Sequence, residues 1–122
     1  MKVELKKVPY VRGDAEWLRA RCGKALPDKK EVVAYLSQGR TLKAMSMVEQ
    51  YLLGTGFVDD ALSVRTDGTW AWTSTTAFYV AKHDLELPPE FLAHVRERKF
   101  RMPSKAELER MELTIPRDDS DY

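Results

Sequence analysis

An Asp-Gly pair at residues 67–68 lies between two short arms in which apolar and polar residues alternate. Asp-Gly supplies the positive φ angles of a type I′ turn, so this pattern predicts a β-hairpin over 62–72. Alternation places every second side chain on the same face of a strand. The side chains grouped in this way are Leu62 and Val64 in the first arm, and Trp70 and Trp72 in the second. We therefore expect one strongly apolar sheet face, covered by helices.

Helix start and stop signals lie on both sides of this hairpin. Short polar side chains cap the first turn of a helix, proline is tolerated there, and glycine ends helices. Before the hairpin, we expect a helix over 15–22 capped by Asp14, and a helix over 29–38 that begins with a capping box of Asp28 and Glu31 and ends at Gly39. After the hairpin, we expect three more helices. The first is capped by Thr73 or Ser74, the second begins at Pro88-Pro89, and the third begins with the Ser104–Glu107 capping box.

Strand signals outside the hairpin are weaker. Residues 2–6 alternate with period two and predict a strand that ends before Pro9. Residues 40–54 are ambiguous, because Leu42 and Met45 suit a buried strand while Val48 and Tyr51 extend a helical pattern. We expect a short strand there, followed by a helical turn that ends at Gly54.

These elements predict an α+β fold, in which a small antiparallel sheet with a central hairpin packs against several helices. The expected core consists of the apolar positions that share a face of each element. They are Leu5, Trp17, Leu18, Val32, Val33, Leu36, Leu42, Val64, Trp70, Trp72, Phe78, Val80, Phe91, Leu92 and Val95.

The chain length and composition are those of one ordinary domain. The 122 residues are 43% hydrophobic and 32% charged, and the net charge is +1. We expect one domain over 1–116 and a flexible acidic tail over 117–122. The single cysteine, Cys22, suits a reducing compartment, and no apolar run approaches the roughly 20 residues of a membrane helix. We therefore expect a cytoplasmic protein without membrane contact.

Motifs of common enzyme classes are absent from the sequence, including phosphate loops, nucleophile elbows and zinc-binding histidine pairs. His83 is expected near a helix end, where a cation complements the dipole, and His94 on the solvated side of its helix. Glu86 and Glu90 are a possible acid-base pair, but a first-turn role for Glu90 is the stronger interpretation. We expect no catalytic residue, metal or cofactor.

Charge is distributed unevenly along the chain. Residues 51–95 contain two basic and six acidic side chains, most of them in predicted loops and turns around the hairpin. Such a set predicts an acidic rim that binds a basic partner, with ordinary solvated loops as the alternative. The six residues are Asp59, Asp60, Asp67, Asp84, Glu86 and Glu90.

The opposing candidate is a basic cluster just beyond the predicted fourth helix. Four cations surround an aromatic side chain, and this combination can hold phosphates while the ring stacks on a base. A solvated helix end rich in cations is the alternative, since Glu97 interrupts the cluster. The residues are Arg96, Arg98, Lys99, Phe100 and Arg101.

A set of turn, core-aromatic and helix-start motifs extends over roughly 31–96. The stretches are 33–39, the Asp-Gly-Thr-Trp-Ala-Trp of 67–72, Ala77–Val80, His83, and Leu87–His94. Together they resemble a pattern in small bacterial proteins that look like immunity proteins of toxin systems, including contact-dependent growth inhibition. The resemblance implies a cytoplasmic protein that binds and neutralises a delivered toxin domain without catalysis.

The sequence therefore predicts two alternative functions. The first is an immunity protein whose acidic rim binds a cognate toxin domain, with a nuclease as the favoured toxin because nucleases have basic substrate surfaces. The second is a nucleic-acid-binding adaptor that uses the basic cluster. Binding to nucleic acid would weaken steeply with salt, which distinguishes the two.

Overall fold

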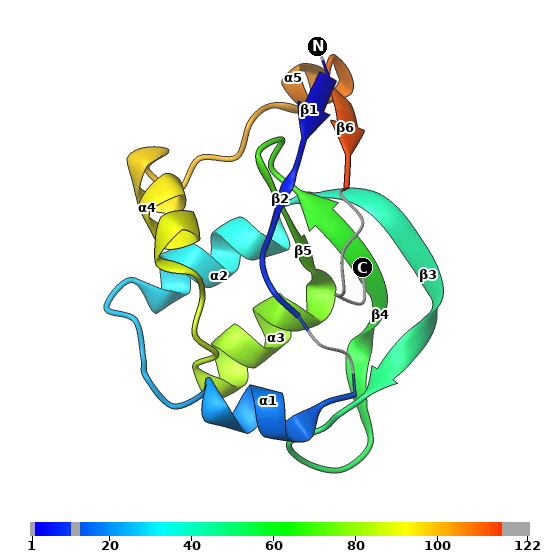
Figure 1. Ribbon diagram of the computed structural model, residues 1–122, viewed down its shortest axis with the longest axis vertical. Coiled ribbons are helices and arrows are strands. Elements are labelled where there is room, and N and C mark those ends of the chain that lie inside the picture. The colour runs from blue at the N-terminus through cyan, green and yellow to red at the C-terminus, as the bar shows by residue number, and fades with distance from the viewer. Residues whose placement is uncertain (1, 11–12, 116–122) are drawn as a thin grey trace.

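The computed structural model describes residues 2–10 and 13–115 and has the predicted α+β class (Figure 1). The expected acidic tail, 117–122, lies outside the described residues. The helices are α1 (Ala15–Ala20), α2 (Lys29–Ser37), α3 (Ser74–His83), α4 (Pro89–Glu97) and α5 (Lys105–Glu109). The strands are β1 (Lys2–Glu4), β2 (Lys6–Lys7), β3 (Arg40–Gln50), β4 (Phe57–Thr66), β5 (Trp70–Thr73) and β6 (Glu112–Thr114).

The main sheet has four strands in the order β2-β5-β4-β3, so the predicted hairpin β4-β5 is central. Its strands β3, β4 and β5 are antiparallel, as expected, but β2 runs parallel to β5. A second, two-stranded sheet joins β1 to β6, also in parallel. The sheets are therefore mixed, because the N-terminal segment pairs with strands from later in the chain that run in its own direction.

The prediction of a short strand and a helical turn over 40–54 is wrong. Residues 40–50 form one strand that pairs with β4, and its register shifts between Ala44 and Val48 and again before Gln50. The chain then turns, and the Tyr51 N–H donates to the Gly56 carbonyl at 2.9 Å. Pairing with β4 satisfies the backbone here and overrides the local helical pattern.

Helix starts follow the sequence signals closely. The Asp14 carboxylate accepts a hydrogen bond from the backbone N–H of Trp17 at 2.9 Å, and the Ser104 hydroxyl accepts one from the backbone N–H of Glu107 at 3.2 Å. Asp28 precedes α2 but makes no side-chain cap. Gly39 follows α2, yet its φ is not positive. A Cβ there would lie 2.5 Å from the Trp72 ring, so close packing accounts for this glycine.

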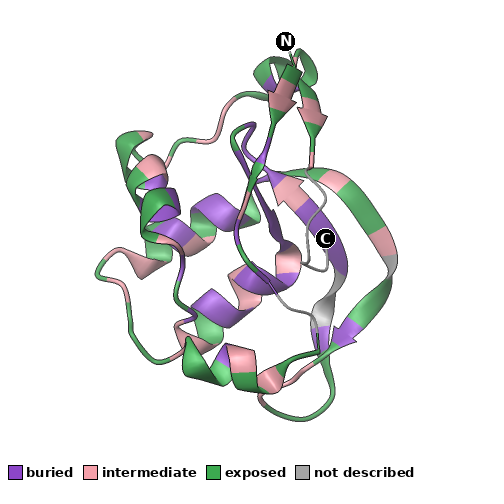
Figure 2. Cartoon of the chain, in the orientation of Figure 1, coloured by how far each residue is buried: buried purple, intermediate pink, exposed green. Residues whose placement is uncertain are grey.

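The main core lies between the sheet and helices α2, α3 and α4 (Figure 2). Phe91 of α4 packs on both indoles of β5, with ring centroids 5.3 Å from Trp70 and 5.6 Å from Trp72. The Trp72 indole N–H donates to the Leu36 carbonyl at 3.0 Å, which satisfies its polar atom inside the core. The prediction that both indoles are buried is confirmed.

Both faces of the hairpin are buried, whereas the sequence pattern predicts one apolar face. Val64 lies opposite Thr73, and Trp72 lies opposite Arg65, so Val64 and Trp72 point to different sides of the sheet. Val64 packs with Leu5 and Ala71 in a second, smaller cluster. Of the expected core residues, four are only partly buried: Trp17, Val33, Leu42 and Phe78. Those missed include Val8, Tyr10, Tyr35, Tyr79, Leu85, Leu87 and Leu108.

The hairpin turn differs from the predicted type I′. The Asp67 N–H donates to the Trp70 carbonyl at 3.3 Å, and of the two residues between them only Gly68 has a positive φ, +91°. Positive φ at the first central residue alone is the pattern of a type II′ turn. A Cβ at Gly68 would also lie 2.9 Å from the Met111 sulfur. The turn therefore needs glycine for its backbone conformation and for its packing.

Asp67 is not part of an exposed acidic rim, which corrects the sequence prediction. The residue is 2% exposed, and one carboxylate oxygen, Oδ1, accepts hydrogen bonds from the Thr69 and Trp70 N–H groups at 2.9 and 2.8 Å. Its other oxygen, Oδ2, accepts a hydrogen bond from the Tyr35 hydroxyl and lies 2.8 Å from His94 Nε2. His94 therefore faces the hairpin turn rather than solvent. One carboxylate joins the turn to α2 and α4.

Two tyrosines carry strongly perturbed hydroxyl groups. Burial raises the pKa of Tyr35 far above its usual value, and the hydrogen bond to Asp67 raises it further. Burial likewise raises the pKa of Tyr10, whose hydroxyl donates to Glu49. Both tyrosines therefore stay protonated in the folded chain at pH values where an unfolded tyrosine ionises.

We predict that Asp67→Ala lowers the free energy of unfolding by about 3–5 kcal/mol, the usual cost of removing one partner from a buried charged cluster. Urea denaturation measures this change. Asp14→Ala is the control, because it removes an exposed cap and should cost about 1 kcal/mol. Equal losses in the two variants would show that the Asp67 cluster contributes little.

We predict that wild-type stability falls steeply above pH 10. An unfolded tyrosine loses its proton near pH 10 while Tyr35 keeps it, so Tyr35 costs about 1.4 kcal/mol of unfolding free energy per pH unit above that point. Tyr35→Phe has no hydroxyl group to ionise at this position. The difference in unfolding free energy between wild type and Tyr35→Phe should therefore become smaller as pH rises from 9 to 11, and should stay constant from pH 6 to 8. A constant gap throughout would contradict the prediction.

Candidate functional site

The acidic residues predicted from the sequence to form one rim have different surroundings wherever the structure describes their side chains. Asp67 is buried under the hairpin turn, and the Asp84 carboxylate pairs with the Lys29 ammonium at 2.7 Å. Glu86 and Glu90 are exposed, before and within the first turn of α4. Asp59 and Asp60 lie in β4, but their side chains lie outside the described part of the structure. Among the described side chains of this set, Glu86 and Glu90 are therefore the exposed carboxylates available for a binding surface.

The basic cluster is largely committed to contacts within the chain. The Arg96 guanidinium donates two hydrogen bonds to the Asp28 carboxylate, at 2.8 and 3.0 Å, and these hold the pKa of Asp28 below its usual range. Arg98 Nε donates to the Arg101 carbonyl at 3.0 Å. Phe100 packs against the main core, and both Phe100 and Lys99 have positive φ. The aromatic ring is therefore partly buried against the core rather than fully exposed.

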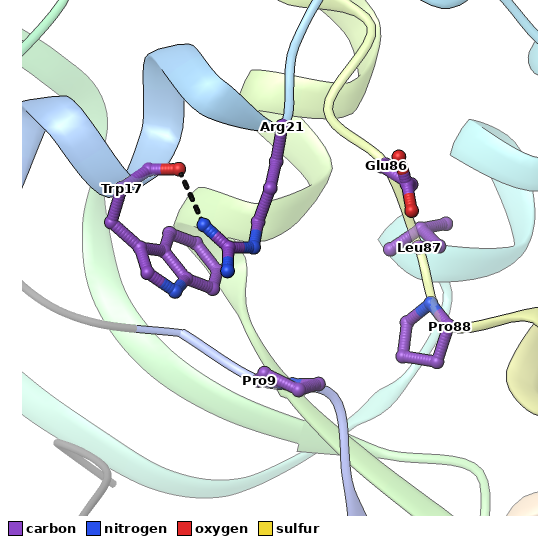
Figure 3. A pocket seen from close by; sticks show the side chains of 6 residues that line it. All are labelled: Pro9, Trp17, Arg21, Glu86, Leu87 and Pro88. Carbon is purple, nitrogen blue, oxygen red and sulfur yellow. Dashed lines mark hydrogen bonds between the residues drawn. The ribbon is translucent and has the colours of Figure 1, made fainter.

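A different surface gathers around the segment that joins α3 to α4, residues 84–88. Two depressions meet there, and both are lined by Glu86 and Leu87. We call the first the Trp17 cleft, which has a volume of about 140 Å³ and is lined by Pro9, Trp17, Arg21, Glu86, Leu87 and Pro88 (Figure 3). We call the second the Leu92 groove. It has a volume of about 390 Å³ and lies between residues 24–27, residues 85–89 and α4.

The local sequence explains why Glu86 is displayed here. The segment alternates buried Leu85, exposed Glu86 and buried Leu87, so the two leucines anchor it in the core and the carboxylate points outward. The Glu86 N–H donates to the Arg21 carbonyl at 2.7 Å. A second bond, from the Gly23 N–H to the His83 carbonyl at 3.0 Å, holds the same two chain segments together.

The Trp17 cleft combines an aromatic ring with charges of both signs. The Arg21 guanidinium lies over the Trp17 indole at 4.5 Å from the ring centre and donates to the Trp17 carbonyl at 3.1 Å. Figure 3 shows this pair on one side of the cleft, and Glu86, Leu87 and Pro88 on the other. Arginine and tryptophan side chains are enriched among the residues that anchor protein interfaces.

The sequence alone does not indicate that Trp17, Arg21 and Lys24 line a surface site. They belong to α1 and the loop after it, about sixty residues before Glu86, and no local motif connects the two segments. The two backbone hydrogen bonds described above, together with packing of Trp17 on the main core that contains Leu85 and Leu87, bring them together. From the sequence, Trp17 is recognisable only as an apolar position of a predicted helix, which places it in the expected core.

Other chemically active groups lie apart from this surface or form contacts of their own. His83 Nε2 lies 2.5 Å from the Tyr51 hydroxyl, inside a cluster of aromatic rings at the end of α3. Burial raises the pKa of the Cys22 thiol, and nearby Asp84 raises it further. Within residues 2–10 and 13–115, no group of three or more His, Cys, Asp or Glu side chains is placed to hold a metal ion.

Comparison with known proteins adds no relative. The sequence matches no family model and no curated protein, and the fold matches no solved structure. In the described part of the chain, no helix has the length and apolar character needed to cross a membrane.

We predict that Trp17 accounts for most of the fluorescence quenching by acrylamide. The chain has three tryptophans, of which Trp70 and Trp72 are 6% and 0% exposed while Trp17 lines an open cleft. Trp17→Phe should therefore remove most of the quenchable emission and leave the protected emission of the core. If Trp17→Phe left the quenching constant unchanged, the cleft would not be open in solution.

Proposed function

We propose that this chain is a non-enzymatic immunity protein, which binds and neutralises a cognate toxin domain in the cytoplasm, with a nuclease as the favoured toxin. The observation that carries the proposal is the exposed carboxylate of Glu86 between the Trp17 cleft and the Leu92 groove. Specific protein interfaces combine apolar pockets for anchoring side chains with a charged rim. The resemblance of roughly 31–96 to immunity proteins supports the same function.

Electrostatics favours a partner with a basic surface near α4. Glu86 and Glu90 are exposed, and Glu90 lies in the first turn of α4, where the helix dipole stabilises a carboxylate. Neither forms an ion pair with a described residue. Carboxylates of this kind can mimic phosphates on a nuclease and accelerate its capture.

A protein partner fits these observations better than a nucleic acid. In the basic cluster, the Arg96 guanidinium is hydrogen-bonded to Asp28, and the Phe100 ring packs against the core. The cation and the aromatic ring that would contact a phosphate and a base therefore already have partners within the chain. Only part of the Phe100 ring is exposed, which reduces the area on which a base could stack.

Coexpression tests the proposal directly. The chain should protect a sensitive cell against the toxin domain encoded by its upstream neighbouring gene and should form a complex with that domain. It should give no protection against an unrelated toxin. Neither protection nor a complex with the neighbouring toxin domain would overturn the proposal.

We predict that the double variant Glu86→Lys/Glu90→Lys binds the toxin domain with an association rate about tenfold lower at low salt, and with little change in dissociation. High salt should erase the difference because it screens exposed charges. Biolayer interferometry at two salt concentrations measures the association and dissociation rate constants.

The control is Glu31→Lys/Glu97→Lys, which makes the same change in net charge at exposed positions outside the two depressions. Each double variant replaces one carboxylate in the first turn of a helix, so the two should lose a similar amount of stability, about 1 kcal/mol. If the two variants slowed association equally, net charge rather than this surface would control capture.

A further inference from the structure

The Leu92 groove has an apolar floor made by core side chains. Leu85, Leu87 and Leu92 line it and are 3%, 2% and 9% exposed, and Leu26 adds a partly buried wall. Its volume of about 390 Å³ is large enough for one or two apolar side chains of a partner. The floor is rigid, because the same leucines pack into the main core.

The rim of the groove carries one cation that is not neutralised within the described chain. Arg96 and Lys24 both line the groove, but Arg96 is held by two hydrogen bonds to Asp28. Lys24 is exposed and has no ion pair with any described residue. The groove therefore combines an apolar floor with two exposed charges of opposite sign in its lining, the ammonium of Lys24 and the carboxylate of Glu86.

The shape of this region favours a protein segment over a small molecule as occupant. The Leu92 groove and the Trp17 cleft share Glu86 and Leu87 as lining residues, so this surface offers two neighbouring recesses rather than one small-molecule pocket. A polypeptide can place one side chain in the groove and neighbouring side chains over the cleft. Hot-spot residues of interfaces occupy such desolvated pockets.

We propose that the Leu92 groove is the anchor site for a partner protein segment in which an apolar side chain, seated on the leucine floor, lies beside an acidic residue that pairs with Lys24. This inference rests on the proposed function and specifies the partner chemistry of the same surface. The partner is thus basic where it faces Glu86 and acidic where it faces Lys24, which gives the complex a defined orientation.

The test uses a displayed library of random twelve-residue peptides, selected for binding to the full chain. The enriched peptides should contain a large apolar residue next to Asp or Glu. Ala93 is exposed on α4 and lines the groove, so Ala93→Arg fills the site and should weaken the enriched peptides at least about tenfold by fluorescence anisotropy. Ala34→Arg, at an exposed position on α2, is the matched control and should leave binding unchanged.

A charge exchange at Lys24 gives a second readout that does not depend on the groove being blocked. Selection on Lys24→Glu should enrich basic residues next to the apolar anchor, whereas selection on Lys30→Glu, an exposed control on α2, should still enrich acidic ones. Peptides that bind Ala93→Arg as well as wild type, or that keep acidic neighbours on Lys24→Glu, would overturn the inference, as would a selection that enriches nothing. The library needs no toxin, so this result and the protection assay can fail independently.

Discussion

The buried carboxylate of Asp67 is the interaction on which the arrangement of this fold depends most. It closes its own turn through two backbone N–H groups and also accepts from Tyr35 of α2 and faces His94 of α4. A carboxylate is stable in an apolar interior only when its oxygens are fully hydrogen-bonded. The turn, α2 and α4 are therefore held in one relative position, and the position of α4 in turn sets one wall of the Leu92 groove.

The hairpin that carries Asp67 is covered on both faces, which is unusual for a short antiparallel pair. Helices cover the face with Trp70 and Trp72, while Leu5 and the segments at both ends of the chain cover the face with Val64 and Ala71. Buried tyrosines supply much of the remaining core, and their hydroxyls find partners on distant segments. Each such bond adds directional specificity to packing that is otherwise non-directional.

The candidate binding surface is a consequence of the same core. Leu85 and Leu87 anchor the segment between α3 and α4, and this alternation presents Glu86 on the outside. Two backbone hydrogen bonds then bring the loop after α1 to the same place. The proposed partner contacts are therefore made by side chains whose backbones are rigidly supported, which lowers the entropic cost of binding.

Local signals in the sequence were sufficient for the hairpin, for the starts of α1 and α5, for α4 after its prolines and for the burial of Trp70 and Trp72, because caps, turns and alternation act over a few residues. The sequence also identified Glu86 and Glu90 as exposed acidic residues. Tertiary structure decided the rest. Pairing with β4 made 40–50 a strand, and burial against α2 and α4 removed Asp67 from the surface. Contacts between segments sixty residues apart placed Trp17 and Arg21 beside Glu86, and no local pattern encodes a contact of that range.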